Sequence, residues 1–206
     1  MKNSDIRRYY VNRRSPLFLI YTTRETDIEE FPSIKAHLEK FRPLLESKRE
    51  CREGKLPWFS LHWPRDQRIF EGEKIVTPNR AFENTFALSE SSLYGMSDIF
   101  FITSNCQEEE PGYVLAILNS QVMNQWFWSN RKPKGRIGEY VGTPLERIPI
   151  RRIDFSDPAD VEIHHRMLYL ARAMNTSNDE ETVELQSEID SLITRLYGLK
   201  SSTNLL

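Results

Sequence analysis

The chain has 206 residues, of which 39% are hydrophobic and 28% charged, so it allows one ordinary domain with a buried core, or a domain with a helical appendage. The formal net charge of -2 excludes a protein that coats nucleic acid by bulk charge. Met1 is followed by charged residues, and the apolar stretches are too short to span a bilayer, so we expect no signal peptide and no membrane partner. Cys51 and Cys106 form no paired motif, which fits a reducing, cytoplasmic setting.

Charge is distributed unevenly along the chain. Residues 1–14 hold five basic residues and one acid, a net charge of +4, and residues 131–152 hold seven basic residues and two acids, a net charge of +5. From residue 153 onward ten acids outweigh four bases, a net charge of -6. A polyanionic partner would therefore meet particular segments rather than the whole surface.

The first quarter of the chain predicts a strand and then a helix. Residues 17–21, Leu-Phe-Leu-Ile-Tyr, are aromatic and branched enough to form a buried strand. Pro32 suits the first turn of a helix, and apolar residues follow at helical spacing towards Gly54. Pro43 lies inside this pattern and should kink the helix or divide it in two, because proline cannot donate the internal hydrogen bond.

The middle of the chain predicts short strands and turns, because short apolar runs alternate with Pro, Gly, Asn and Ser. Residues 114–128 also carry a helical period, which favours a helix there. A basic, glycine-containing loop at 131–142 and an extended segment at 148–150 follow. The short apolar runs are residues 58–63, 74–77, 97–103 and 113–118.

The C-terminal part predicts two helices that could form an acidic hairpin. Asp157 can cap the first helix, with Pro158 in its first turn. Asn178 opens the second, and Gly198 ends it. The fold class is therefore α+β, with a strand-rich domain at 1–152 and a C-terminal helical extension at 153–206 packed on it.

The motifs of common enzymes are missing from the chain. It has no GxxxxGK[ST] phosphate loop, no GxGxxG turn and no GxSxG elbow, and its four histidines lack the spacing of zinc ligands. The adjacent His164 and His165 are best explained by surface or packing roles. Glu53-Gly54-Lys55 has the E-x-K spacing of a metal-dependent nuclease, but a charged helix end closed by glycine explains it better. We therefore expect no catalytic residue, no metal and no cofactor in this chain.

Four segments combine basic side chains with aromatic or amide groups that could contact DNA. Arginine makes bidentate bonds with phosphate or guanine, and tyrosine adds a hydrogen bond or a stacking face. Each segment alone is weak evidence, since a charge run is usually a solvated face, but four of them apart from an acidic region favour nucleic acid. We expect the first and fourth to contact mainly phosphates, and Trp63, Arg65, Arg68, Asn79 and Arg80 to lie nearer the bases. The candidates are Arg7, Arg8, Tyr9, Arg13 and Arg14; Trp63, Arg65 and Arg68; Lys74, Asn79 and Arg80; and Arg131, Lys132, Lys134 and Arg136.

Several short motifs occur in an order shared with a known family. Residues 2–9, Lys-Asn-Ser-Asp-Ile-Arg-Arg-Tyr, match an opening of lysine, small residue, then Asp-Ile-Lys/Arg-Arg-Tyr. Later matches are Leu-Pro-Trp at 56–58, Lys-Ile-Val-Thr-Pro at 74–78, Leu-Asn-Ser at 118–120, Ile-Pro-Ile at 148–150 and Glu-Ile-Asp at 188–190. In this order the chain resembles the TaqI-like C-terminal specificity domain from Lys2 to Leu199.

The resemblance implies a function in DNA recognition. In that family the domain lies C-terminal to an adenine-specific DNA methyltransferase, often fused with an endonuclease in bacterial restriction–modification enzymes, and reads the recognition sequence so that the catalytic domain can flip and methylate an adenine. The partners implied are double-stranded DNA and the methyltransferase catalytic domain of a parent polypeptide. S-adenosylmethionine, and Mg²⁺ for cleavage, would belong to that parent. This chain lacks the Asn/Asp-Pro-Pro-Tyr motif and the glycine-rich cofactor site, so we expect it to be a fragment of such an enzyme.

Two alternatives stay open. The basic loops could dock a protein, such as a methyltransferase domain or a restriction subunit, instead of DNA. A small metal-dependent nuclease using Glu53 and Lys55 is less favoured, because no Pro-Asp pair upstream supplies a second metal carboxylate.

Overall fold

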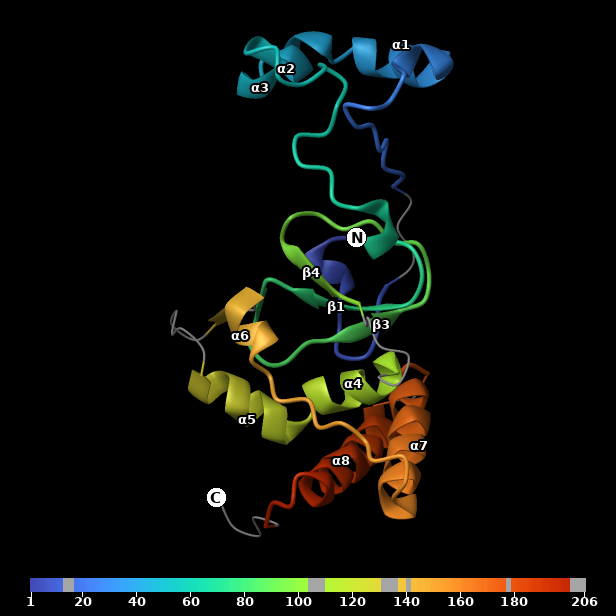
Figure 1. Ribbon diagram of the computed structural model, residues 1–206, viewed down its shortest axis with the longest axis vertical. Helices are drawn as coiled ribbons and strands as arrows, with labels where there is room; N and C mark the ends of the chain where they lie inside the picture. Colours follow the sequence, from blue (N-terminus) through green and yellow to red (C-terminus); the bar gives the residue numbers. More distant parts are fainter. Residues whose placement is uncertain (13–16, 104–109, 131–136, 140–141, 177–178, 201–206) are drawn as a thin grey trace. The chain divides into compact units, whose positions relative to one another are not determined.

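The computed structural model describes residues 1–12, 17–103, 110–130, 137–139, 142–176 and 179–200. The chain forms two compact units (Figure 1). The smaller unit is Pro16–Gln67, and the larger joins Met1–Ser15 to Arg68–Leu206. Helices and antiparallel strands both occur, and two long helices follow the strands, which confirms the α+β class.

A three-stranded antiparallel sheet lies in the larger unit. Its order is β3–β1–β4, where β1 is Lys74–Pro78, β3 is Ala87–Ser89 and β4 is Ile99–Ile102. Every residue of β1 is buried, because both faces of this central strand are covered. Ile75 packs into a cluster with the helices, whereas Val76 packs with Ile6 and Val11 of the first segment. Successive residues of β1 thus join two separate apolar clusters.

Helices cover one face of the sheet (Figure 1). Helix α4 contacts β1 and β3, α7 packs on α4, and α8 packs on α7 and α5. The apolar run at 113–118, which the sequence groups with the short strand-like runs, is helical. Helix α4 is buried on nearly all sides, so its sequence lacks the polar face that would reveal a helical period. The helices are α4, Pro111–Leu118; α5, Gln121–Asn130; α6, Gly142–Glu146; α7, Pro158–Ala173; and α8, Asp179–Leu196.

The predicted C-terminal helices are confirmed. The carboxylate of Asp157 accepts a hydrogen bond from the Ala159 amide at 2.9 Å, and Pro158 occupies the first turn of α7. Gly198 adopts φ +62 after α8, and the Leu199 amide donates back to Thr194, which closes the helix end. Asn178 lies outside the described residues. Residues on both sides of position 152 contribute to one apolar cluster, and the domain boundary there stays a prediction.

A second, two-stranded sheet pairs segments that are far apart in sequence. Strand β2, Arg80–Ala81, runs antiparallel to β5, Gly138–Glu139. Arg80 is opposite Glu139, and Ala81 is opposite Gly138. The chain that follows the basic residues at 131–136 is therefore hydrogen-bonded directly beside Arg80.

The smaller unit consists mostly of short helices. Pro32 begins α1, as predicted, and a new helix with Pro43 in its first turn confirms the predicted division. None of the residues in these three helices is buried, and the unit's buried apolar residues are Ile28 and Leu56. The helices are α1, Pro32–Glu39; α2, Arg42–Glu46; and α3, Arg49–Arg52.

The buried strand predicted at 17–21 is wrong. These residues form no strand, and Leu17, Phe18 and Leu19 are 69%, 100% and 54% exposed. A strand needs a neighbour to pair its backbone groups. The Thr22 carbonyl accepts from the Leu61 amide at 2.9 Å. Within the described ranges, no helix is long and apolar enough to cross a membrane.

Candidate DNA interface

One end of the three-stranded sheet carries exposed side chains of several kinds. Where β1 stops, the Asn79 amide donates to the Asp98 carbonyl at 2.8 Å, which ties the start of β2 to the turn before β4. Arg80 is exposed there, Phe82 is 72% exposed and Met96 is 62% exposed. We call residues 79–82, 96–98 and β5 the sheet end.

Arg80 is oriented by an exposed ion pair. Its Nε and Nη2 lie 3.1 and 3.0 Å from Oε1 of Glu139, and the Arg80 side chain is 58% exposed. Such exposed pairs contribute only about 0.2–1 kcal/mol, so a ligand can compete for the guanidinium at little cost. The candidates Arg131, Lys132, Lys134 and Arg136 precede β5 in sequence but lie outside the described residues, as do Arg13 and Arg14.

A network of buried amides anchors the chain that leaves the sheet end. The Asn84 side chain donates to the Leu118 carbonyl at 2.7 Å, and its backbone amide donates to Oδ1 of Asn124 at 2.9 Å. The Asn119 side chain bonds both backbone groups of Phe86, accepting at 3.0 Å and donating at 2.9 Å. Asn84 and Asn119 are 1% and 0% exposed. The segment before β3 is therefore fixed to the junction of α4 and α5.

The amino-terminal candidates have mainly structural contacts. Arg7 is exposed, whereas Arg8 is half-buried and donates to the Asn119 carbonyl. Tyr9 is 1% exposed, adopts φ 67, and donates its hydroxyl to Gln186 Oε1 at 2.9 Å. The prediction that Tyr9 contacts DNA is therefore corrected, because its ring lies in the core and offers no stacking face to a duplex.

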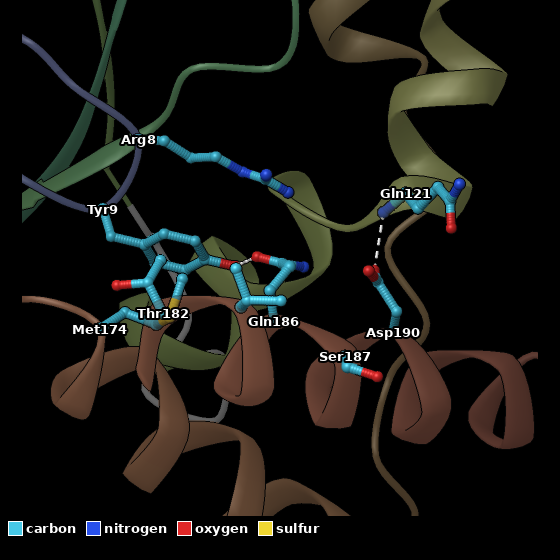
Figure 2. A pocket seen from close by; sticks show the side chains of 9 residues that line it. Arg8, Tyr9, Gln121, Met174, Thr182, Gln186, Ser187 and Asp190 are labelled. Atoms are coloured by element: carbon cyan, nitrogen blue, oxygen red, sulfur yellow. Dashed lines mark hydrogen bonds between the residues drawn. The ribbon is translucent and has the colours of Figure 1, made fainter. Parts of the chain in front are cut away.

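A hollow of about 620 Å³ lies beside Arg8 and Tyr9 (Figure 2). Asp190 reaches it from α8, and its carboxylate accepts from the Gln121 amide at 2.7 Å. Burial raises the pKa of Asp190, although the Gln121 amide and the charge of Arg8 act against that rise. The lining of the hollow contains one basic residue, Arg8, and one acidic residue, Asp190, among neutral side chains. The hollow therefore lies between the first segment and α8.

The prediction that Lys74 contacts DNA is also corrected. It is fully buried in β1, and its Nζ donates to the carbonyls of Gly72 and Ser91 at 3.0 and 2.7 Å. Burial lowers the pKa of this ammonium group. A side chain held in this way cannot reach a phosphate, so Lys74 stabilises the strand instead.

The remaining described candidates lie on short, irregular segments. Trp63 is 83% exposed in the smaller unit, with its ring 5.1 Å from that of His62. Arg65, in the same unit, is half-buried, and its carbonyl accepts from the Tyr21 hydroxyl. Arg68 is exposed in the larger unit, within the 3-10 turn Gln67–Ile69. These residues stay predicted DNA contacts.

The described residues assemble no nuclease centre. Glu53 accepts from Arg49 at 2.7 Å and from Lys55 at 2.6 Å, and these bonds lower its pKa. Gly54, at φ +68, closes the helix end. No cluster of three potential metal ligands occurs among the residues that the structure describes. His164 is buried, with the Tyr113 ring 5.1 Å away, and it packs in the core.

Sequence reasoning missed Phe82, Met96 and the amides that hold the sheet end. Phe82 follows Arg80 by two residues, and an aromatic residue shortly after an arginine at a turn is a weak signal that could have been noted. Asn119 lies within the Leu-Asn-Ser motif at 118–120, which the sequence shows only as a match to the family. Its role depends on Phe86, which is 33 residues away, so no local pattern shows it.

Comparisons with known proteins found a family match and two similar methyltransferases. Residues 2–150 match the TaqI-like C-terminal specificity domain. The Type II methyltransferase M.HincII of Haemophilus influenzae is 26% identical over 168 residues, which cover 77% of this chain and 33% of the relative. The Type II methyltransferase M.HindII, from a strain of the same species, is 26% identical over 154 residues, 70% of this chain and 29% of the relative. The chain spans about a third of the length of these relatives. Because the family match covers well over half of its residues, the chain belongs to the TaqI-like C-terminal specificity domain family.

Proposed function

We propose that this chain recognises a specific sequence in double-stranded DNA, as the specificity domain of an adenine-specific DNA methyltransferase or restriction–modification enzyme. Membership of a specificity-domain family supports this, as do two relatives named as Type II methyltransferases. The sheet end carries the proposal: Arg80 is exposed there, oriented by Glu139, on a segment fixed by buried amides. A rigid support of this kind is what a base-reading side chain requires.

The proposed contacts divide by type. Arg80 would read a base, since arginine bonds bidentately to guanine in the major groove. The basic residues at 131–136, adjacent in sequence to β5, would contact phosphates and add affinity for any duplex. The acidic α7–α8 hairpin would face away from the DNA, because its negative charge repels the phosphates of the duplex.

Catalysis would belong to a methyltransferase domain of the parent polypeptide, which is the proposed protein partner. S-adenosylmethionine, and Mg²⁺ if the parent also cleaves, would bind there. The sequence lacks the Asn/Asp-Pro-Pro-Tyr motif, and the described residues bring no three potential metal ligands together. This chain would supply only the position on the DNA at which that domain acts.

A matched pair of arginine variants tests the proposal. Arg80 and Arg166 each form an exposed ion pair, with Glu139 and Glu188 respectively, but only Arg80 lies at the sheet end. A duplex selected by this chain from a random library should lose about 1–3 kcal/mol of binding free energy on Arg80→Gln, with relaxed preference at one position. Arg166→Gln should leave both unchanged. Fluorescence anisotropy over a range of salt concentrations measures affinity and the number of phosphate contacts.

Three results would contradict the proposal. One is the failure of the random library to yield an enriched sequence. Another is affinity that ignores salt concentration, since phosphate contacts release counterions. The third is equal loss on Arg80→Gln and Arg166→Gln, which would remove the special role of the sheet end.

A further inference from the structure

Phe82 is the most exposed aromatic residue of the sheet end, and no bonding function accounts for it. Its ring is 72% exposed, next to the ion pair of Arg80 and Glu139. Two other exposed aromatic residues of the larger unit, Phe155 and Tyr169, have partners. The ring of Phe155 packs 5.5 Å from that of His164, and Tyr169 lies beneath the guanidinium of Arg166 at 5.0 Å. Among the described residues, no ring or cation contact holds Phe82.

The backbone around Phe82 is fixed on both sides. Ala81, directly before it, pairs with Gly138 of β5. Asn84, two residues after it, is bonded through its side chain to Leu118 and through its amide to Asn124. The exposed tip therefore consists of Phe82 and Glu83 between two anchors. Holding an apolar side chain in water in this way stabilises nothing in the folded chain, but it lowers the conformational entropy that binding must overcome.

The charges near the tip indicate which part of a duplex it would meet. Glu83 follows Phe82 directly, and Glu139 accepts the bonds of Arg80. Two carboxylates disfavour close approach to a phosphate. Base edges and base faces carry no net charge, and a carboxylate can accept from the amino group of cytosine. The tip is therefore suited to the interior of a groove rather than to the backbone.

We propose that Phe82 is an apolar wedge that enters between adjacent base pairs of the bound duplex, beside the base read by Arg80. Apolar side chains used in this way partly unstack one base step and kink the duplex. Met96, exposed at the same sheet end, would line the groove next to the opened step. This inference rests on the proposed DNA recognition and adds to it a second source of specificity, because base steps differ in how easily they unstack.

The test uses the complete chain and duplexes of the selected sequence that carry 2-aminopurine at one position each. Unstacking raises the fluorescence of this base, so the wild-type protein should brighten one position. Phe82→Ala should abolish that increase and weaken binding roughly tenfold, within the range measured for loss of a base–aromatic stack. Because no phosphate contact is lost, the salt dependence should not change. Phe82→Trp should keep the fluorescence increase.

Phe155→Ala is the matched control, since it removes an exposed phenylalanine away from the sheet end, and it should leave the fluorescence increase and the affinity unchanged. Wild-type protein that selects no sequence overturns the proposed function and this inference together. Selective binding that Phe82→Ala leaves intact overturns the wedge alone. Weaker binding without brightening at any position overturns it too. So does a Phe82→Ala variant that binds DNA normally but no longer binds a separately produced methyltransferase domain, which would assign the tip to protein docking.

Discussion

The sheet end and the α7–α8 hairpin are supported by different kinds of polar contact. In the hairpin, charged side chains bond to charged partners: Arg166 makes two bonds with Glu188, at 2.6 and 2.7 Å, and Asp160 accepts at 2.6 Å from Arg151, which precedes α7. The sheet end also has an exposed ion pair, between Arg80 and Glu139, but the chain that leaves it is held by buried neutral amides such as Asn119. The amides support the loop without using its arginine or its aromatic ring. Under the proposed function, this arrangement leaves the side chains of Arg80 and Phe82 available to DNA.

The largest expected effect follows removal of the Asn119 amide. Asn119→Ala leaves the amide of Phe86 buried without its bonding partner and opens a small cavity. We expect a loss of about 2–4 kcal/mol in the free energy of unfolding, measured by urea denaturation. DNA affinity should fall as well, because the loop would lose its anchor. Asn130→Ala, an exposed substitution at the end of α5, should cost less than about 0.5 kcal/mol. Equal costs for the two variants would show that the neutral network does not support the sheet end.

Lys74→Met tests whether the buried cation of β1 stabilises the fold rather than contacting DNA. The variant keeps an apolar side chain of similar length but loses the bonds to the carbonyls of Gly72 and Ser91. We expect a loss of about 1–3 kcal/mol in unfolding free energy. The slope of DNA affinity against salt concentration should stay that of the wild type. A slope reduced by about one unit would mean that Lys74 contacts a phosphate after all, and that the sheet end extends into β1.

Asp160→Asn tests the internal pairing of the hairpin, with a smaller effect. The Arg151 guanidinium, and then the Asp154 amide, hold the pKa of Asp160 below its ordinary value. The side chain of Arg151 is 37% exposed, so solvent screening limits the expected loss at pH 7 to about 1–2 kcal/mol. The stability that ionised Asp160 contributes is complete above the ordinary aspartate pKa, about 3.9, and is lost as pH falls through the lower pKa of the folded state.

The difference in unfolding free energy between wild type and Asp160→Asn should therefore be constant near neutrality and shrink in acid. Denaturation followed at several pH values measures it, and DNA affinity at pH 7 should be unchanged. A gap that widens as the pH falls would contradict the pairing of Asp160 with Arg151.

Much of the fold could be predicted because adjacent residues decide it. Pro32 begins a helix, Pro43 divides the next stretch, Asp157 caps α7 and Gly198 ends α8, and each acts on backbone groups within a few positions. The strand predicted at 17–21 is wrong because strand pairing is not decided by adjacent residues. Its side chains suit a strand, but pairing depends on a partner that composition does not reveal.

The candidate site was less predictable because burial depends on distant contacts. Tyr9 reads as part of a basic, aromatic surface segment, yet its hydroxyl bonds to Gln186 and its ring is enclosed. Lys74 reads as an exposed cation, but it occupies the central strand. Arg80 could be proposed from its type and its turn alone, and its side chain is exposed. Exposed candidates were therefore easier to identify from sequence than the buried residues that position them.

The bond between Tyr9 and Gln186 also constrains how the molecule is made. Its two partners are 177 positions apart, and the Tyr9 amide bonds to Phe86 in between. A ribosome releases the first segment long before α8, so the early residues can complete their packing only after synthesis has passed the last helix. Contacts of such long sequence separation slow folding, since a large loop must close before they form. The nascent chain thus exposes core residues of its first segment to solvent until α8 has been synthesised.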